Sequence, residues 1–151
     1  FRLETLFDLK KKGSLIGIDL QGFIRTRDSK NVLINSLWEQ KEEALGLTHY
    51  LKADGVEAEF LTGESDLVSA AKILKSYGPK EVIITHKDGV LVYANNQIFE
   101  EPFKLEKIIG RSGRGDTCGA SYVYMRLTSG PGESTKWAAA ATSLRWSQTP
   151  P

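Results

Sequence analysis

The chain has 151 residues, of which 40% are hydrophobic and 26% charged, a composition typical of one soluble domain with a core of its own. Twenty basic and nineteen acidic residues leave a net charge of +1, too weak a field to attract nucleic acid or an anionic membrane. The single cysteine excludes an internal disulfide, and no apolar run reaches the roughly 20 residues that span a bilayer. We therefore expect a cytoplasmic protein with a small-molecule partner, and neither a nucleic acid nor a membrane partner.

The first elements predicted along the chain are a helix and a strand. Apolar residues spaced through positions 3–9, followed by lysines and Gly13, predict an amphipathic helix that ends at a glycine. The apolar run at residues 15–20 predicts a strand buried on both faces of a parallel sheet. Asp19 and Arg25 follow near its carboxyl end, and the pattern gives them a position without a firm role.

The middle of the chain alternates between strand and helix patterns. The clearest helix is at residues 64–77, because its apolar residues share one face and Gly78-Pro79 ends it. Asn95-Asn96 tolerates a positive φ and predicts the turn of a hairpin. The other elements predicted here are a weak helix at 38–46, a short strand at 48–52, a buried strand at 81–85, and hairpin strands at 90–94 and 97–101.

Two helices complete the predicted fold, at residues 115–127 and 133–146. Strands that alternate with helices predict an α/β protein with three αβα layers and a mostly parallel sheet. In such a fold, ligands bind beyond the carboxyl ends of the strands, so the candidate sites are the turns that connect strands to helices.

The densest of these turns is the glycine-rich segment 110–116, which precedes a predicted helix. Glycines allow backbone N–H groups to turn toward a ligand, and a helix start carries partial positive charge, so the segment suits a phosphate. Arg114 adds a full charge, and Asp116 in the first turn is placed to accept a proton from an attacking hydroxyl. The alternative is structural: glycine makes the turn, and Asp116 complements the helix dipole.

The run Ser112-Gly113-Arg114-Gly115-Asp116, followed by a threonine, resembles the second signature of the ribokinase-like, or PfkB, carbohydrate kinases, commonly D-T-x-G-A-G-D. The resemblance implies a ribokinase-like fold with a Rossmann-type core. It also implies that Gly113, Arg114 and Gly115 form an anion hole for the transferred phosphoryl group, and that Asp116 is the catalytic base. Arg114 stands where the family usually has alanine.

Two further stretches resemble the family in the same order. In residues 52–63, Glu57 matches the glutamate of the N-x-x-E motif, which positions magnesium through water, and Asp54 stands at the asparagine. Asp54 and Glu57 also have the spacing of a capping box at a helix start, which is the structural alternative. In residues 82–93, Thr85 and Gly89 match the nucleotide-binding T-x-G-x-x-G segment, and Lys87 lies near its first glycine. A plain turn between two strands is the alternative there.

The resemblance implies a parent enzyme that transfers the γ-phosphoryl of ATP, with Mg²⁺, to a hydroxyl of a sugar or nucleoside-like acceptor. The chain begins without methionine, in a helical segment, so we expect residues 1–151 to be the C-terminal nucleotide- and phosphate-binding part. The N-terminal sugar-binding part and the lid are then absent, and the fragment alone is expected to be inactive or weakly active.

Two other functions compete with this interpretation. One is a nucleotide-binding or interaction module that keeps the kinase fold without catalysis. The other is a cysteine nucleophile at Cys118, because the start of a helix can lower the pKa of a thiol; His49 and His86 lie elsewhere in the chain, and nothing in the sequence orients either toward it. The acceptor, the nucleotide preference and the oligomeric state are left open, a homo-oligomer of the parent protein included.

Overall fold

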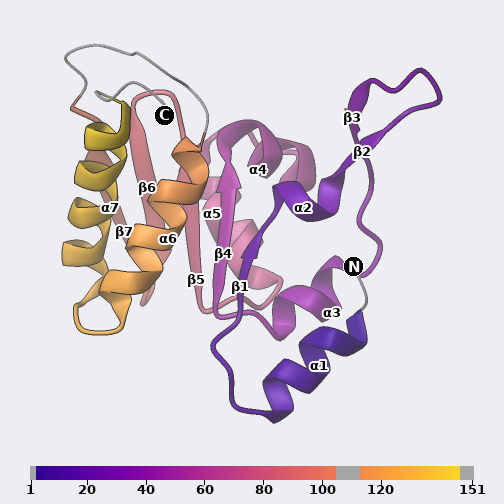
Figure 1. The fold of residues 1–151 in the computed structure, drawn as a ribbon, viewed down its shortest axis with the longest axis horizontal. Helices are drawn as coiled ribbons and strands as arrows, with labels where there is room; N and C mark the ends of the chain where they lie inside the picture. The colour runs from indigo at the N-terminus through magenta and orange to yellow at the C-terminus, as the bar shows by residue number, and fades with distance from the viewer. Residues whose placement is uncertain (1–2, 105–112, 147–151) are drawn as a thin grey trace.

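The computed structural model describes residues 3–104 and 113–146, which form a sheet covered by helices on both faces (Figure 1). The strands, in spatial order, are β1 (Gly17–Asp19), β4 (Tyr50–Asp54), β5 (Glu81–Thr85), β6 (Gly89–Ala94) and β7 (Gln97–Pro102). β1, β4 and β5 pair in parallel, and β6 and β7 continue the sheet as an antiparallel hairpin, so four of the five strands run in one direction. The predicted three-layer α/β fold is confirmed.

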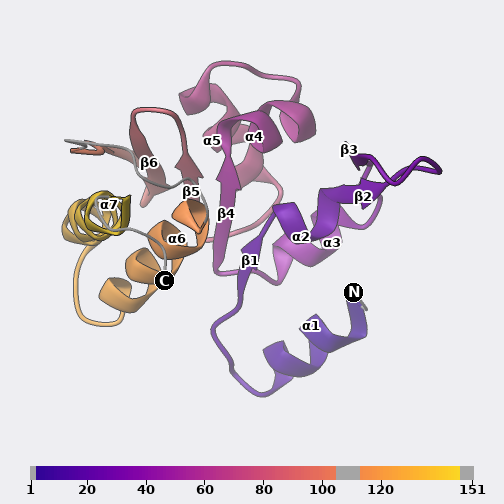
Figure 2. The ribbon, with the colours of Figure 1, turned by 45° about the horizontal axis from the view of Figure 1, so that its top comes forward.

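Two layers of helices enclose the sheet (Figure 2). On one face lie α6 (Arg114–Arg126) and α7 (Pro131–Trp146). On the other lie α4 (Gly55–Thr62) and α5 (Leu67–Ser76), and α1 (Leu3–Lys11) and α3 (Lys41–Gly46) pack into the same core as these two. Among the described residues, no helix has the length and apolar character needed to cross a lipid bilayer.

The alternation of side chains along β5 explains why this strand lies at the centre. Val82 and Ile84 belong to the core beneath α4 and α5, whereas Ile83 belongs to the core beneath α6 and α7. Successive residues of a strand point to opposite faces, so an unbroken apolar run is buried on both sides. β5 is fully buried along its length, as the sequence predicts.

Several elements differ from their predicted bounds, among them two helices and the first strand. The weak helix predicted at residues 38–46 begins only at Lys41. The helix predicted at residues 64–77 begins at Leu67 because the Asp66 side chain caps it, accepting a hydrogen bond of 2.8 Å from the Ser69 amide. The strand predicted at residues 15–20 spans only Gly17–Asp19, and its prediction as buried on both faces is wrong: Ile18 is buried, whereas Gly17 is exposed and Asp19 is half-buried.

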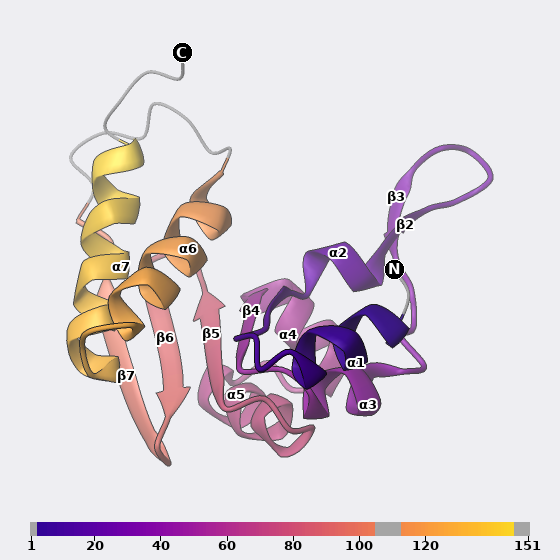
Figure 3. The ribbon, with the colours of Figure 1, turned by 60° about the horizontal axis from the view of Figure 1, so that its bottom comes forward.

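A hairpin that the sequence did not predict follows the short helix α2 (Gln21–Ile24). Its strands, β2 (Arg25–Arg27) and β3 (Leu33–Asn35), form a separate two-stranded sheet that extends away from the body of the protein (Figure 3). The Asp28 carboxylate accepts hydrogen bonds from the amides of Lys30 and Val32, which closes the turn. Its strands are short and exposed, so they carry no burial pattern that predicts a strand.

Candidate active site

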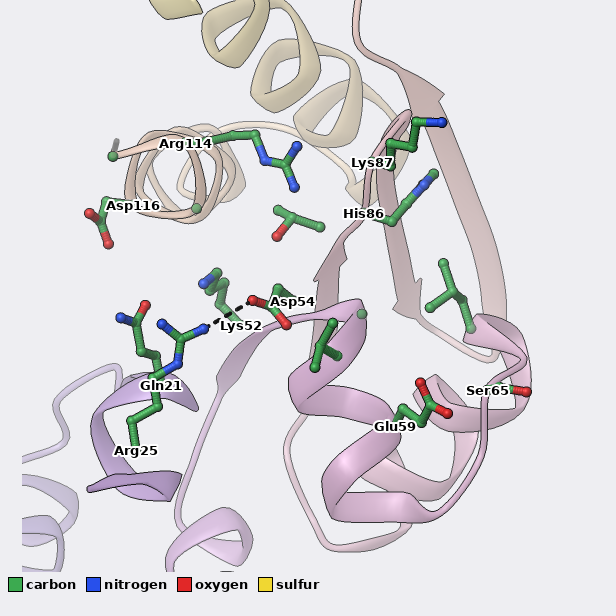
Figure 4. A pocket seen from close by; sticks show the side chains of 16 residues that line it. Gln21, Arg25, Lys52, Asp54, Glu59, Ser65, His86, Lys87, Arg114 and Asp116 are labelled. Carbon is green, nitrogen blue, oxygen red and sulfur yellow. Dashed lines mark hydrogen bonds and ion pairs between the residues drawn. The ribbon is translucent and has the colours of Figure 1, made fainter. Parts of the chain in front are cut away.

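The carboxyl ends of β4 and β5 and the start of α6 surround a cavity of about 790 Å³ (Figure 4). β4 ends at Asp54 and β5 ends at Thr85, and both residues line the cavity. The parallel neighbour β1 ends beside them at Asp19. The cavity therefore lies at the edge of the sheet where the fold predicts a ligand site.

Helix α6 begins at this cavity. Gly113 is its N-cap residue and has φ of 76°, a left-handed conformation that glycine adopts without a steric cost. The N–H groups of a first helical turn have no partner within the helix and carry partial positive charge, so they suit an anion. The predicted anion-hole residues Gly113, Arg114 and Gly115 and the predicted base Asp116 all line the cavity, and Asp116 is exposed. The predicted signature also includes residues 110–112, which lie outside the described residues.

Arg114 turns its charge toward the cavity. Its guanidinium carbon lies 5.5 Å from the centroid of the Phe103 ring, within the range of a cation–π contact. In Figure 4 the guanidinium points into the space between α6 and the ends of β4 and β5. A side chain that is longer than the alanine of the family pattern therefore adds positive charge to the site.

Asp54 and Glu57 form the capping box that the sequence left as an alternative. The Asp54 carboxylate accepts a hydrogen bond from the Glu57 amide, and the Glu57 carboxylate accepts one from the Asp54 amide, both at 2.8 Å. This reciprocal pair fixes the start of α4. Arg25 reaches the same corner, and its Nη2 lies 3.1 Å from Glu57 Oε1 and 3.4 Å from Asp54 Oδ2.

This corner also has oxygen atoms that fit a hydrated magnesium ion. Glu57 is 1% exposed, and burial raises the pKa of its carboxyl group, an effect that the nearby Asp54 charge reinforces. Glu57 Oε1 accepts no hydrogen bond among the described residues, and its contact is the ion pair with Arg25. Carboxylate oxygens are ligands that Mg²⁺ prefers, so the pair suits this ion, with Arg25 as a competing cation. Asp54 lines the cavity and Glu57 lies behind it.

The turn between β5 and β6 brings only part of the predicted nucleotide-binding segment to the cavity. Thr85 and Lys87 line the cavity, and His86 lies between them. Gly89 does not line the cavity: it begins β6, and a Cβ atom there would collide with the backbone carbonyl of Glu101 on β7. The structure thus gives Gly89 a packing role within the sheet.

Sequence reasoning missed Lys52, which lies on β4 between Leu51 and Ala53. Its ammonium group lies 3.0 Å from the carboxylate of Asp19, and the residue is only 8% exposed. A lysine at the centre of an otherwise buried strand is rare, because burial of a charge is costly. The sequence signal that could have identified Lys52 is therefore a lysine within the otherwise apolar strand interior of residues 50–54.

The structure gives no support to a cysteine nucleophile. Cys118 is fully buried, and burial raises the pKa of its thiol to about 11. His49 is engaged elsewhere, because its Nδ1 accepts a hydrogen bond of 3.1 Å from the Ile16 amide. Cys118 therefore has the surroundings of an inert core residue.

The sequence pattern of the pfkB family carbohydrate kinases matches residues 20–148. The chain belongs to this family. The match covers every residue that lines the cavity, from Gln21 on α2 to Asp116 on α6.

Solved structures agree with this assignment. A pyrophosphate-dependent kinase in the ribokinase family, complexed with a pyrophosphate analog and myo-inositol, is 34% identical with a TM-score of 0.92. Arabidopsis thaliana ribokinase complexed with ribose and ATP has 18% identity and a TM-score of 0.75 over 97% of this chain, and it supports the fold alone. This chain is covered completely by the first structure and spans 55% of it, and it spans 46% of the second.

One curated relative is also similar over a shorter stretch. The cytidine kinase of Thermococcus kodakarensis is 39% identical over 72 residues, which is 44% of this chain and 25% of that protein. The pfkB family chain described here therefore spans about half of the solved structures it matches and a quarter of this relative.

Proposed function

We propose that the protein that contains this chain transfers a phosphoryl group to a hydroxyl of a sugar, polyol or nucleoside-like acceptor. The observation that carries this proposal is the start of α6, where an exposed carboxylate, the N-terminal end of a helix and the Arg114 guanidinium share one cavity. Positive charge placed beside a base is the arrangement that phosphoryl transfer to an alcohol requires.

Each group at the cavity has a role in the proposed reaction. Asp116 accepts the proton of the acceptor hydroxyl as its oxygen bonds to phosphorus and the bond from phosphorus to the leaving group breaks. The backbone at Gly113, Arg114 and Gly115, with the Arg114 side chain, stabilises the charge on the transferring group. Magnesium, when bound, neutralises charge on the donor phosphates, and Glu57 with Asp54 would hold it through water.

ATP with Mg²⁺ is the donor that membership of the family favours, with Thr85 and Lys87 at the nucleotide. Pyrophosphate is a second candidate, and a specific observation supports it. Among the described residues, four cationic side chains line the cavity. Two of them depart from the family pattern: Lys87 lies near a position where the pattern has glycine, and Arg114 stands where it has alanine. Such a cavity offers more charge for phosphate than the pattern requires, and a structural relative at 34% identity is described as pyrophosphate-dependent.

The proposal concerns the whole protein, since this chain spans 55% of the structure at 34% identity. We assign residues 1–151 to the C-terminal nucleotide- and phosphate-binding part, and the sugar-binding part and lid to the remainder of the protein. The exposed position of Asp116 supports this division, because exclusion of water and orientation of the acceptor contribute strongly to phosphoryl transfer. Activity of the isolated chain is therefore expected to be weak or absent.

The proposal is tested by following donor and product in the full-length protein with ³¹P NMR. The reactions contain Mg²⁺, either ATP or pyrophosphate, and myo-inositol, ribose or cytidine as acceptor. We expect a phosphomonoester to form only when donor and acceptor are both present, and the donor consumed identifies the nucleotide or pyrophosphate preference. Donor binding without transfer to any acceptor would contradict the kinase and favour the non-catalytic binding module.

A further inference from the structure

Lys52 lies at the boundary between two cavities. The second cavity, of about 360 Å³, is lined by residues of β1, β4, β5 and α6. Among the residues that the structure describes, three line both cavities: Lys52, Gly115 and Asp116. Gly115 and Asp116 have already been assigned to the anion hole and to the base. Lys52 is the third member of this set and has no role in the reaction proposed above.

The ammonium group of Lys52 is held in place by the Asp19 carboxylate on the neighbouring strand β1. In the parallel pairing of β1 and β4, Asp19 is the register partner of Lys52, and Nζ lies 3.0 Å from Asp19 Oδ2 and 3.3 Å from Oδ1. An ammonium group has three N–H donors, and the Asp19 carboxylate has two oxygen atoms, so this ion pair does not occupy all three donors. The ion pair offsets the cost of burying the charge and leaves donor capacity for a ligand.

Helix α6 packs closely against the same lysine side chain. A Cβ atom built on Gly115 would lie 2.6 Å from Lys52 Nζ and 2.8 Å from Cε. Gly119, one turn later, also faces Lys52, and a Cβ atom there would lie 3.4 Å from its Cγ. The lysine therefore lies next to the backbone segment to which the anion hole is assigned. A side chain at position 115 would collide with it, so glycine there leaves the space that the lysine occupies.

We propose that Lys52 is a further catalytic residue, whose ammonium group binds the phosphoryl group during its transfer, and that Asp19 is the residue that positions it. The inference rests on the proposed phosphoryl transfer and adds a side chain to that site. It also explains why a lysine occupies a buried strand position, since a charge fixed before the reaction stabilises developing negative charge without reorganisation.

The step leaves Lys52 chemically unchanged. The acceptor oxygen bonds to phosphorus, the bond from phosphorus to the leaving phosphate breaks, and the hydroxyl proton passes to Asp116. Lys52 keeps its proton and acts through its charge and one hydrogen bond. The competing explanation is that Lys52 and Asp19 only join β1 to β4 as a structural ion pair, so the experiment must separate these two roles.

The first test replaces Lys52 by methionine, which keeps the length of the side chain and removes its charge. In the full-length protein we expect Lys52→Met to lower kcat on the order of 10²- to 10³-fold, the usual effect of removing one donor to a developing anion. The acceptor KM and the affinity for methylenediphosphonate, measured by calorimetry, change much less. Lys72→Met, on the exposed side of α5, is the control and keeps wild-type kcat.

The second test moves the ammonium group without removing it. Gly115→Ala keeps every backbone amide but forces the mobile end of Lys52 aside, so we expect kcat to fall roughly ten- to a hundredfold while the protein stays folded by circular dichroism. Gly119→Ala is the matched comparison, because its Cβ meets Lys52 at an ordinary contact distance, and we expect it to lower kcat much less. Equal kcat in the two alanine variants would overturn the inference.

Asp19→Asn completes the comparison. A structural ion pair predicts that Lys52→Met and Asp19→Asn lower the unfolding free energy and kcat by equal amounts, and that result would also overturn the inference. A catalytic Lys52 predicts a much larger loss of kcat in Lys52→Met. These outcomes are distinct from failure of the proposed function, in which the wild-type protein itself shows no acceptor-dependent consumption of donor.

Discussion

Asp116 and Cys118 lie two positions apart in α6 and have opposite surroundings. Asp116 is exposed at the cavity, whereas Cys118 is fully buried among the apolar side chains beneath α6 and α7. Because burial raises the pKa of the Cys118 thiol to about 11, this thiol stays protonated at neutral pH. At the start of the same helix, the Asp116 carboxylate is therefore accessible from the cavity, whereas the Cys118 thiol is not.

Alkylation of Cys118 measures this difference. In the native full-length protein, we expect iodoacetamide to modify Cys118 roughly a hundredfold more slowly than in urea, because the thiolate is scarce and the site is closed. Peptide mapping by mass spectrometry gives the extent of modification at this position. An added thiol in Ala140→Cys, on the exposed side of α7, reacts rapidly and serves as the control. Rapid modification of native Cys118 would restore the nucleophile hypothesis.

The sequence predicted some site residues and could not predict others, for a physical reason. Gly113 to Asp116 are contiguous, so one local sequence pattern contains the whole of the proposed anion hole and base. The position of Lys52 depends on the register of β1 with β4 and on the packing of α6 over both, which are contacts between distant parts of the chain. For Asp54 and Glu57 the sequence pattern was ambiguous, because a capping box and the family's magnesium-binding motif have the same residue spacing.

At the scale of elements, α6 is fixed at both ends. Its start lies against Lys52, and its second half is anchored to the beginning of β5 by a buried polar cluster. Tyr122 Oη donates a hydrogen bond of 2.7 Å to Glu81 Oε2, and Arg126 Nη2 donates one of 2.8 Å to Glu81 Oε1. Burial and the Glu81 carboxylate raise the pKa of Tyr122, so this hydroxyl stays a donor. The cluster therefore holds the helix that carries Asp116.

Removal of one hydroxyl tests this anchor. Tyr122→Phe takes one donor from the buried Glu81 carboxylate, so we expect the unfolding free energy to fall by about 1–3 kcal/mol in urea titrations of the full-length protein. Tyr124→Phe, on the exposed side of the same helix, should stay within about 0.5 kcal/mol of wild type. An unchanged midpoint for Tyr122→Phe would show that the cluster contributes nothing to the position of α6.

Elements with a strong local signal matched their predictions. The hairpin of β6 and β7 turns at Asn95 and Asn96, with φ of 52° and 59°, which is the property for which asparagine was singled out. The β2–β3 hairpin escaped prediction because its strands have three residues each and bury little. Short exposed strands depend on turn hydrogen bonds, and these leave little trace in hydrophobic periodicity.

At the scale of the whole molecule, the site is assembled at one edge of the sheet. β1, β4 and β5 bring Asp19, Lys52, Asp54 and Thr85 to this edge, and the start of α6 carries the proposed anion hole to the same edge. This convergence follows from the parallel order of the three strands, which the sequence predicted as a fold class. The central proposal drawn from the pfkB family membership and the geometry is that Asp116 is the base of a phosphoryl transfer.

The most direct test of this claim compares wild type with Asp116→Asn in the full-length protein. Turnover is measured as acceptor-dependent donor consumption, and donor affinity is measured by calorimetry on the same preparations. Because asparagine keeps the shape of the side chain but cannot take a proton, we predict that kcat falls on the order of 10²- to 10⁴-fold while donor affinity stays close to that of wild type. Undiminished turnover in Asp116→Asn would contradict the account.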